Sequence, residues 1–159
     1  MGDSTDKCGV RAYAVEPGTK KIEGRAFCSC YDLEEIEIPS SVRKICRNAF
    51  TGCRSLKKIK IPSSVKLIDG PIFSYCTGLE EITVDENDRW YDSREGCNAI
   101  IDSETNELIS GCKNTVIPAS VTKIADKAFE EVGLDDDYLY DVYKKYGNQS
   151  AMSYYRNKI

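Results

Sequence analysis

Cysteine is the residue type in this sequence with the widest chemical range, because a thiol can ligate a metal, form a disulfide or act as a nucleophile. The 159 residues include eight cysteines and no histidine. The absence of histidine excludes Ser-His-Asp and Cys-His catalysis, histidine-ligated zinc and a histidine-based pH switch. Cys28 and Cys30 form a Cys-x-Cys pair, but no cysteines have the Cys-x-x-Cys spacing of common zinc and redox sites. We therefore expect no catalytic residue, no metal site and no cofactor.

Acidic loops are the second group of residues with chemical potential. The segment that begins at Asp102 starts like a calcium-binding loop, but Glu107 stands where that loop needs glycine, and Lys113 stands where it needs a bidentate acid. The net charge of −4 argues against nucleic-acid binding, which favours a strongly basic surface. No apolar run reaches the roughly 18 residues of a membrane span.

A repeat of 23 residues accounts for the positions of most apolar side chains. Phe27, Phe50 and Phe73 are separated by this step. The same step relates Cys30, Cys53 and Cys76; Leu33, Leu56 and Leu79; Ile36, Ile59 and Ile82; and Ile22, Ile45 and Ile68. One repeat cannot bury its own apolar residues, so successive repeats must stack. The sequence predicts a mainly β solenoid of about five coils, in which the three in-phase cysteines form a buried ladder.

Each repeat contains the signals of a short strand followed by a turn. The Ile-x-Ile alternation predicts a strand with one face inward. Pro39 and Pro62 end that strand, and the following serines suit a turn. We expect residues 48–53 to form a short helical turn with Asn48 near its N-cap.

Three segments resemble BspA-type leucine-rich repeats: Ile-Pro-Ser-Ser-Val at 38–42, Ala-Phe-Thr-Gly-Cys at 49–53, and Ser55-Leu56. Residues 91–118 are similar to a longer repeat variant of the same proteins. The resemblance implies an open β-solenoid with a strand-lined face, and a binding or adhesion role in secreted or surface proteins. It carries over no catalytic residue. Two features depart from it: Thr115 fills an isoleucine column, and the polar start lacks the apolar core of a signal peptide.

A longer repeat predicts a hairpin insertion at about residues 85–112. The spacing between Val84 and Ile117 is 33, which is 23 plus ten. Residues 98–102 and 107–111 can pair about a turn at 103–106. This fold places Ile101 opposite Leu108, Ile100 opposite Ile109, and Cys97 opposite Cys112. In a secreted protein the two cysteines could form a disulfide; otherwise they remain thiols.

The chain divides into a polar N-terminal segment at 1–9, a solenoid at 10–134 and a tyrosine-rich helical segment at 135–159. Acidic residues at 135–137 suit the start of a helix. An apolar stripe then follows, and Gly147-Asn148 separates it from a second helical segment. We expect these helices to cap the last coil. The alternative, which is compatible with capping, is an aromatic contact surface, since six of the ten tyrosines lie between 138 and 155.

In-register stacking of the coils aligns charged residues in columns. One column holds Glu34, Lys57 and Glu80, and its alternating charge opposes slippage of the register. The outward residues of the neighbouring columns are the candidates for binding a protein partner: Glu35, Glu37, Lys58, Lys60, Glu81 and Thr83. The aromatic candidates near them are Tyr31 and Tyr75. A second set, Arg43, Lys44 and Arg47, has no acid in its columns and is the candidate for an anionic contact.

These observations favour a non-enzymatic protein-binding or adhesion module that presents a rigid surface to a protein partner. The alternative is a structural spacer, or a fragment of a longer repeat array, with no site of its own. An enzyme is disfavoured because no catalytic constellation is present in the sequence.

Overall fold

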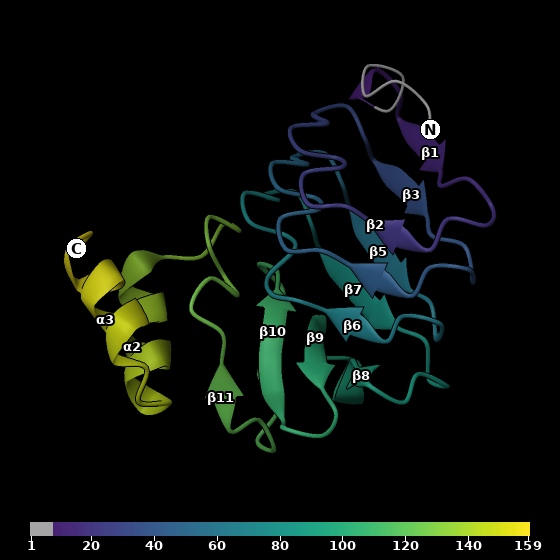
Figure 1. Cartoon of the computed structure of the whole chain (residues 1–159). Coiled ribbons are helices and arrows are strands. Elements are labelled where there is room, and N and C mark those ends of the chain that lie inside the picture. The colour runs from purple at the N-terminus through teal and green to yellow at the C-terminus, as the bar shows by residue number, and fades with distance from the viewer. Residues whose placement is uncertain (1–7) are drawn as a thin grey trace.

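The computed structural model describes residues 8–159, and these form a β-solenoid followed by two helices (Figure 1). Of the polar segment expected at residues 1–9, residues 1–7 therefore lie outside the described part. No helix in residues 8–159 is long and apolar enough to cross a membrane. The predicted mainly β solenoid is confirmed.

Each regular coil contributes one strand to each side of the solenoid. One side holds β1 (Ala12–Ala14), β3 (Glu35–Glu37), β5 (Lys58–Ile61) and β7 (Glu81–Val84). The other side holds β2 (Lys21–Ile22), β4 (Lys44–Ile45) and β6 (Leu67–Ile68). All pairings within these groups are parallel and in register. There are three regular coils rather than the expected five, because the insertion after β7 interrupts the stack.

The repeated apolar residues form the continuous core of the solenoid. The rings of Phe27 and Phe50 stack with centroids 5.4 Å apart, and those of Phe50 and Phe73 are 5.9 Å apart. Cys53 and Cys76 are fully buried, and their thiols donate to the carbonyls of Phe27 and Phe50 at 3.1 Å. The buried cysteine ladder is thus confirmed.

The first rung of the ladder differs from the prediction. Cys30 is buried as expected, but it forms a disulfide with Cys8, to which the sequence assigned no role. Cys8 lies outside the 23-residue columns that contain the other ladder residues, so the periodicity did not reveal it as a partner.

The predicted helical turn at residues 48–53 is wrong. These residues form consecutive turns, and Asn48 adopts a left-handed conformation with φ of +65°. The amide of Gly52 donates to the carbonyl of Ser74 in the next coil at 2.9 Å. Backbone groups at this corner therefore join successive coils, so they are not free to form a helix.

The insertion adds β8 (Tyr91–Asp92), the short 3-10 helix η1 (Arg94–Gly96), β9 (Ala99–Asp102) and β10 (Glu107–Gly111). With β11 (Lys123–Ile124) these strands form a sheet in the order β11-β10-β9-β8. The predicted pairing of Ile101 with Leu108 is confirmed.

The remaining two pairings predicted for the hairpin are wrong. Ile100 pairs with Ser110, because the register shifts between Leu108 and Ser110. Cys97 packs in the C-terminal core cluster, whereas Cys112 packs in the solenoid cluster. Both cysteines are free thiols, so the disulfide considered for them is not formed.

The repeat pattern resumes after the insertion and supports the C-terminal helices. The amide of Tyr75 donates to the carbonyl of Glu130 at 3.0 Å, in the place where Gly52 bonds to Ser74 one coil earlier. The helices are α2 (Asp136–Lys145) and α3 (Gln149–Arg156). Tyr143 of α2 is fully buried against this coil and donates to the carbonyl of Ala125 at 2.8 Å. The helices therefore cover the last coil, as Figure 1 shows.

Candidate partner-binding surface

The outward residues of β1, β3, β5 and β7 line a single hollow of about 590 Å³. We call this hollow the strand groove. Register places Lys58 beside Glu81 and Lys60 beside Thr83. All six residues predicted for a protein partner line it: Glu35, Glu37, Lys58, Lys60, Glu81 and Thr83. The structure thus brings these candidates together, while their role in binding stays a prediction.

Charges in the strand groove are only partly compensated. Lys60 Nζ lies 3.8 Å from a carboxylate oxygen of Asp85 at the groove edge. A hydrogen bond from the Asn87 amide, helped by Lys60, lowers the pKa of Asp85. Within residues 8–159, Glu35 and Lys58 form no ion pair within 4 Å, although they are oppositely charged neighbours in one column. Their charged ends are therefore available to a partner.

Sequence reasoning missed the neutral end of the strand groove. Ala12 and Ala14 of β1 pair with Glu35 and Glu37 and line the same hollow. Both alanines precede these acids by 23 residues, so the repeat itself was the signal that could have found them. The small side chains leave this end of the groove open and uncharged.

Ion pairs and an aromatic contact accompany the column next to the strand groove. Arg11 pairs with Glu34 at 2.8 Å, which continues the alternating column one coil earlier. The guanidinium of Arg54 lies 5.0 Å from the ring centroid of Tyr31, which is half exposed. Tyr75 is also exposed. The aromatic side chains named from the sequence are therefore accessible.

The basic candidates Arg43, Lys44 and Arg47 belong to the coil of β4, on the other side of the solenoid, and do not line the strand groove. The expected absence of an acid partner is wrong for Lys44, whose Nζ lies 3.6 Å from Asp69. Asp69 also accepts a hydrogen bond from the Arg47 amide. Column neighbours alone could not predict this contact, because Asp69 lies two residues beyond Leu67, the in-register partner of Lys44.

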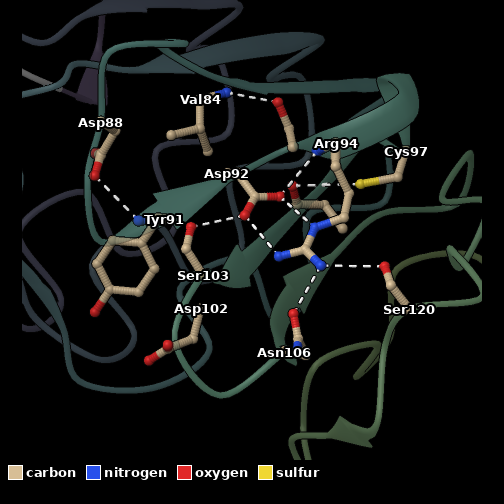
Figure 2. A network of polar contacts seen from close by, with 12 residues as sticks. Val84, Asp88, Tyr91, Asp92, Arg94, Cys97, Asp102, Ser103, Asn106 and Ser120 are labelled. Atoms are coloured by element: carbon tan, nitrogen blue, oxygen red, sulfur yellow. Dashed lines mark hydrogen bonds and ion pairs between the residues drawn. The ribbon is translucent and has the colours of Figure 1, made fainter.

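A polar network in the insertion was also missed by sequence reasoning (Figure 2). The Asp92 carboxylate accepts two hydrogen bonds from the guanidinium of Arg94 and one from the hydroxyl of Ser103, each at 2.7 Å. Arg94 also donates to Asn106 at 2.8 Å and to Ser120 at 3.1 Å. Burial alone would raise the pKa of Asp92, but the hydrogen bonds outweigh it and lower that pKa. The network connects the insertion to the coil of β11, so its role is structural.

Comparison with known proteins places this architecture in a family. The family model for the BspA type leucine rich repeat region matches residues 6–132 in six copies. A search of the curated proteins found no match.

Two solved structures share the fold. A leucine rich cell surface protein from Faecalibacterium prausnitzii is 23% identical, with a TM-score of 0.57 over 76% of this chain and 38% of that one. The pneumococcal vaccine antigen PcpA is 20% identical, with a TM-score of 0.63 over 79% of this chain and 35% of that one. The present chain thus spans little more than a third of either protein. Its repeats, register and matched family model agree, and the chain belongs to the BspA-type leucine-rich repeat family.

Proposed function

We propose that this chain is a non-enzymatic protein-binding or adhesion module that uses the strand groove. The observation that carries the proposal is the convergence of six charged and polar side chains on one hollow. They stand on paired strands, so little conformational entropy is lost when a partner binds. Exposed charges at a rim mainly govern partner choice and association rate, which suits recognition.

The names of the two similar structures support the setting that this proposal assumes, the cell surface. One is named as a cell surface protein and the other as a vaccine antigen. We extend a surface location to the present chain as part of the proposal. Catalysis is disfavoured because the groove groups are open to water, whereas catalytic groups act best where water is excluded.

Charge reversal in the strand groove tests the proposal. The chain carries a photo-cross-linking residue in place of Thr83 and is incubated with extracts of its native environment. A partner should be cross-linked by the otherwise unchanged groove, and the double variant K58E/K60E should bind that purified partner about tenfold more weakly. The control K127E/K144E makes the same change in net charge at exposed lysines outside the groove and should bind normally. Equal affinity of all three folded proteins would remove the groove assignment.

A structural spacer is the second candidate, and one observation favours it. Among the described strands, β1 pairs only with β3, so no described strand lies along its other edge. Light scattering distinguishes the two candidates: concentration-dependent end-to-end association supports a spacer, and a stable monomer supports a separate binding module.

A further inference from the structure

A row of basic residues runs across the coils on the side of β2, β4 and β6. The amide of Arg43 donates to the carbonyl of Lys20 at 2.7 Å, and the amide of Lys66 donates to the carbonyl of Arg43 at 2.8 Å. These three residues therefore occupy equivalent positions in successive coils, and all three are exposed. We call Lys20, Arg43 and Lys66 the basic ladder.

The acidic residues on this side of the solenoid pair with the neighbouring column of lysines and not with the basic ladder. Glu23 pairs with Lys21 at 3.1 Å, and Asp69 pairs with Lys44 at 3.6 Å. In the part of the chain that the structure describes, no ladder residue forms an ion pair. The basic ladder is thus left without a neutralising acid among the described residues.

Like charges on neighbouring strands oppose stability. The column beside the strand groove avoids this problem, since Lys57 lies between Glu34 and Glu80 and is bonded to both through the backbone. The same fold therefore alternates charge in one column and repeats it in another. The repeated charge is therefore not explained by the stability of the fold.

An exposed aromatic residue stands at the end of the basic ladder. Lys66 Nζ lies 5.4 Å from the ring centroid of Trp90, which is 39% exposed. Arg89 directly precedes Trp90, is exposed, and follows Lys66 by the 23-residue step. Leu67 beside Lys66 is also exposed. The surface thus combines a line of cations with an accessible indole ring.

We propose that the basic ladder and Trp90 bind an acidic polysaccharide, carboxylated or sulfated, that lies across the coils. Neighbouring parallel strands are about 4.8 Å apart, so the ladder presents one cation per short step along a line. A linear polymer with an anionic group on successive sugar units matches this arrangement. The exposed indole can pack against the apolar face of a sugar ring while its N–H remains free to hydrogen-bond.

Two other polyanions fit the surface less well. An extended peptide places side chains of one face about 6.8 Å apart, which does not match the ladder spacing. An anionic membrane favours a broad apolar face together with basic residues, whereas the ladder offers only Leu67 and Trp90. The ladder residues do not line the strand groove, so this inference is independent of the proposed protein-binding function.

The single tryptophan of the chain makes the experiment direct, because its fluorescence reports this site alone. The folded full chain is titrated with heparin, which is sulfated, and with polygalacturonate, which is carboxylated. At least one should change Trp90 fluorescence saturably, and binding should weaken as salt is raised. The variant K20Q/R43Q/K66Q should bind about tenfold more weakly, since it removes the aligned charges. The control K57Q/K127Q/K144Q loses the same number of exposed positive charges elsewhere and should bind within about twofold of the unmodified chain.

Four results would overturn the inference. The first is that neither polysaccharide binds, and the second is that the ladder variant and the control bind equally while circular dichroism shows both folded. The third is tighter binding to vesicles containing phosphatidylserine, and the fourth is tighter binding to poly-L-glutamate. Calorimetry with W90F adds an independent readout: retained folding with severalfold weaker polysaccharide binding supports stacking on the indole, and unchanged affinity removes Trp90 from the site.

Discussion

The hydroxyl of Tyr91 accepts a hydrogen bond from the amide of Ile68 at 2.8 Å and lies 3.4 Å from the Ile68 carbonyl, to which it donates. Ile68 belongs to β6, the last strand of the three-stranded sheet β2-β4-β6. Tyr91 follows Ile68 by 23 residues, the step at which the next coil would supply a strand. A side chain therefore takes the place of a strand at this edge.

Other side chains of the insertion likewise accept hydrogen bonds from backbone amides of the last regular coil. In an uninterrupted stack, these amides would face the next regular coil. The acceptors are Ser110 for Ile72, Asn98 for Ile82 and Ser93 for Val84. The insertion thus ends the regular stack without leaving these buried amides unpaired.

Removing the Tyr91 hydroxyl should destabilise the protein. Tyr91→Phe leaves the Ile68 amide without its partner in a buried setting, and we expect the free energy of unfolding to fall by about 1–2 kcal/mol. Urea denaturation followed by far-UV circular dichroism measures the change. The exposed Tyr138 provides the matched control, and Y138F should alter stability by less than about 0.5 kcal/mol. Equal effects of the two variants would contradict the role of Tyr91.

The charged network around Asp92 predicts a pH-dependent contribution to stability. Its pKa is lowered in the folded state, so its contribution is present above the unfolded pKa of about 3.9 and is lost as the pH falls through the folded pKa. Asp92→Asn should reduce stability by about 2 kcal/mol at pH 7, with the difference from the unmodified protein shrinking below about pH 4. Denaturation at pH 7, 5 and 3 tests this, with the exposed loop variant E86Q as control. A constant difference at all three values would count against the charged state of Asp92.

Reversal of the central ladder charge should stabilise the fold. Arg43→Glu would place an acid between Lys20 and Lys66, and we expect a gain of about 0.5 kcal/mol. Lys57→Glu is the mirror experiment, because it places an acid between Glu34 and Glu80 and should destabilise the protein. Thermal unfolding at low salt compares the two, and 1 M salt should reduce both effects. Effects of the same sign would show that the columns do not govern these energies.

The cysteines predict a definite thiol count. The structure has six free cysteines and one disulfide, between Cys8 and Cys30. Titration of the denatured, unreduced protein should therefore reveal six thiols, and prior reduction should raise the count to eight. Replacement of Cys8 by serine should give seven thiols without reduction, because Cys30 is then unpaired. A result of four would indicate a second disulfide, with Cys97 and Cys112 the first pair to examine.

Much of the candidate surface could be predicted from the sequence because a regular solenoid converts sequence spacing directly into position. Once Ile36, Ile59 and Ile82 stack, the residues beside them must form columns, so the six candidate residues that line the strand groove followed from the 23-residue step, while the hollow itself did not. Helical periodicity, a separate signal, predicted the first C-terminal helix from its apolar stripe, and the break at Gly147 separated it from the second helical segment.

Tertiary structure decided what happens where the period is broken. The shift in register between Leu108 and Ser110 moved Cys97 and Cys112 into different core clusters, which simple folding about a turn could not show. The Cys8–Cys30 disulfide, the reach of Asp69 back to Lys44 and the Tyr91 contact with Ile68 likewise depend on side-chain direction. Periodicity specifies which backbone positions are neighbours, whereas only the packed structure determines where each side chain extends from those positions.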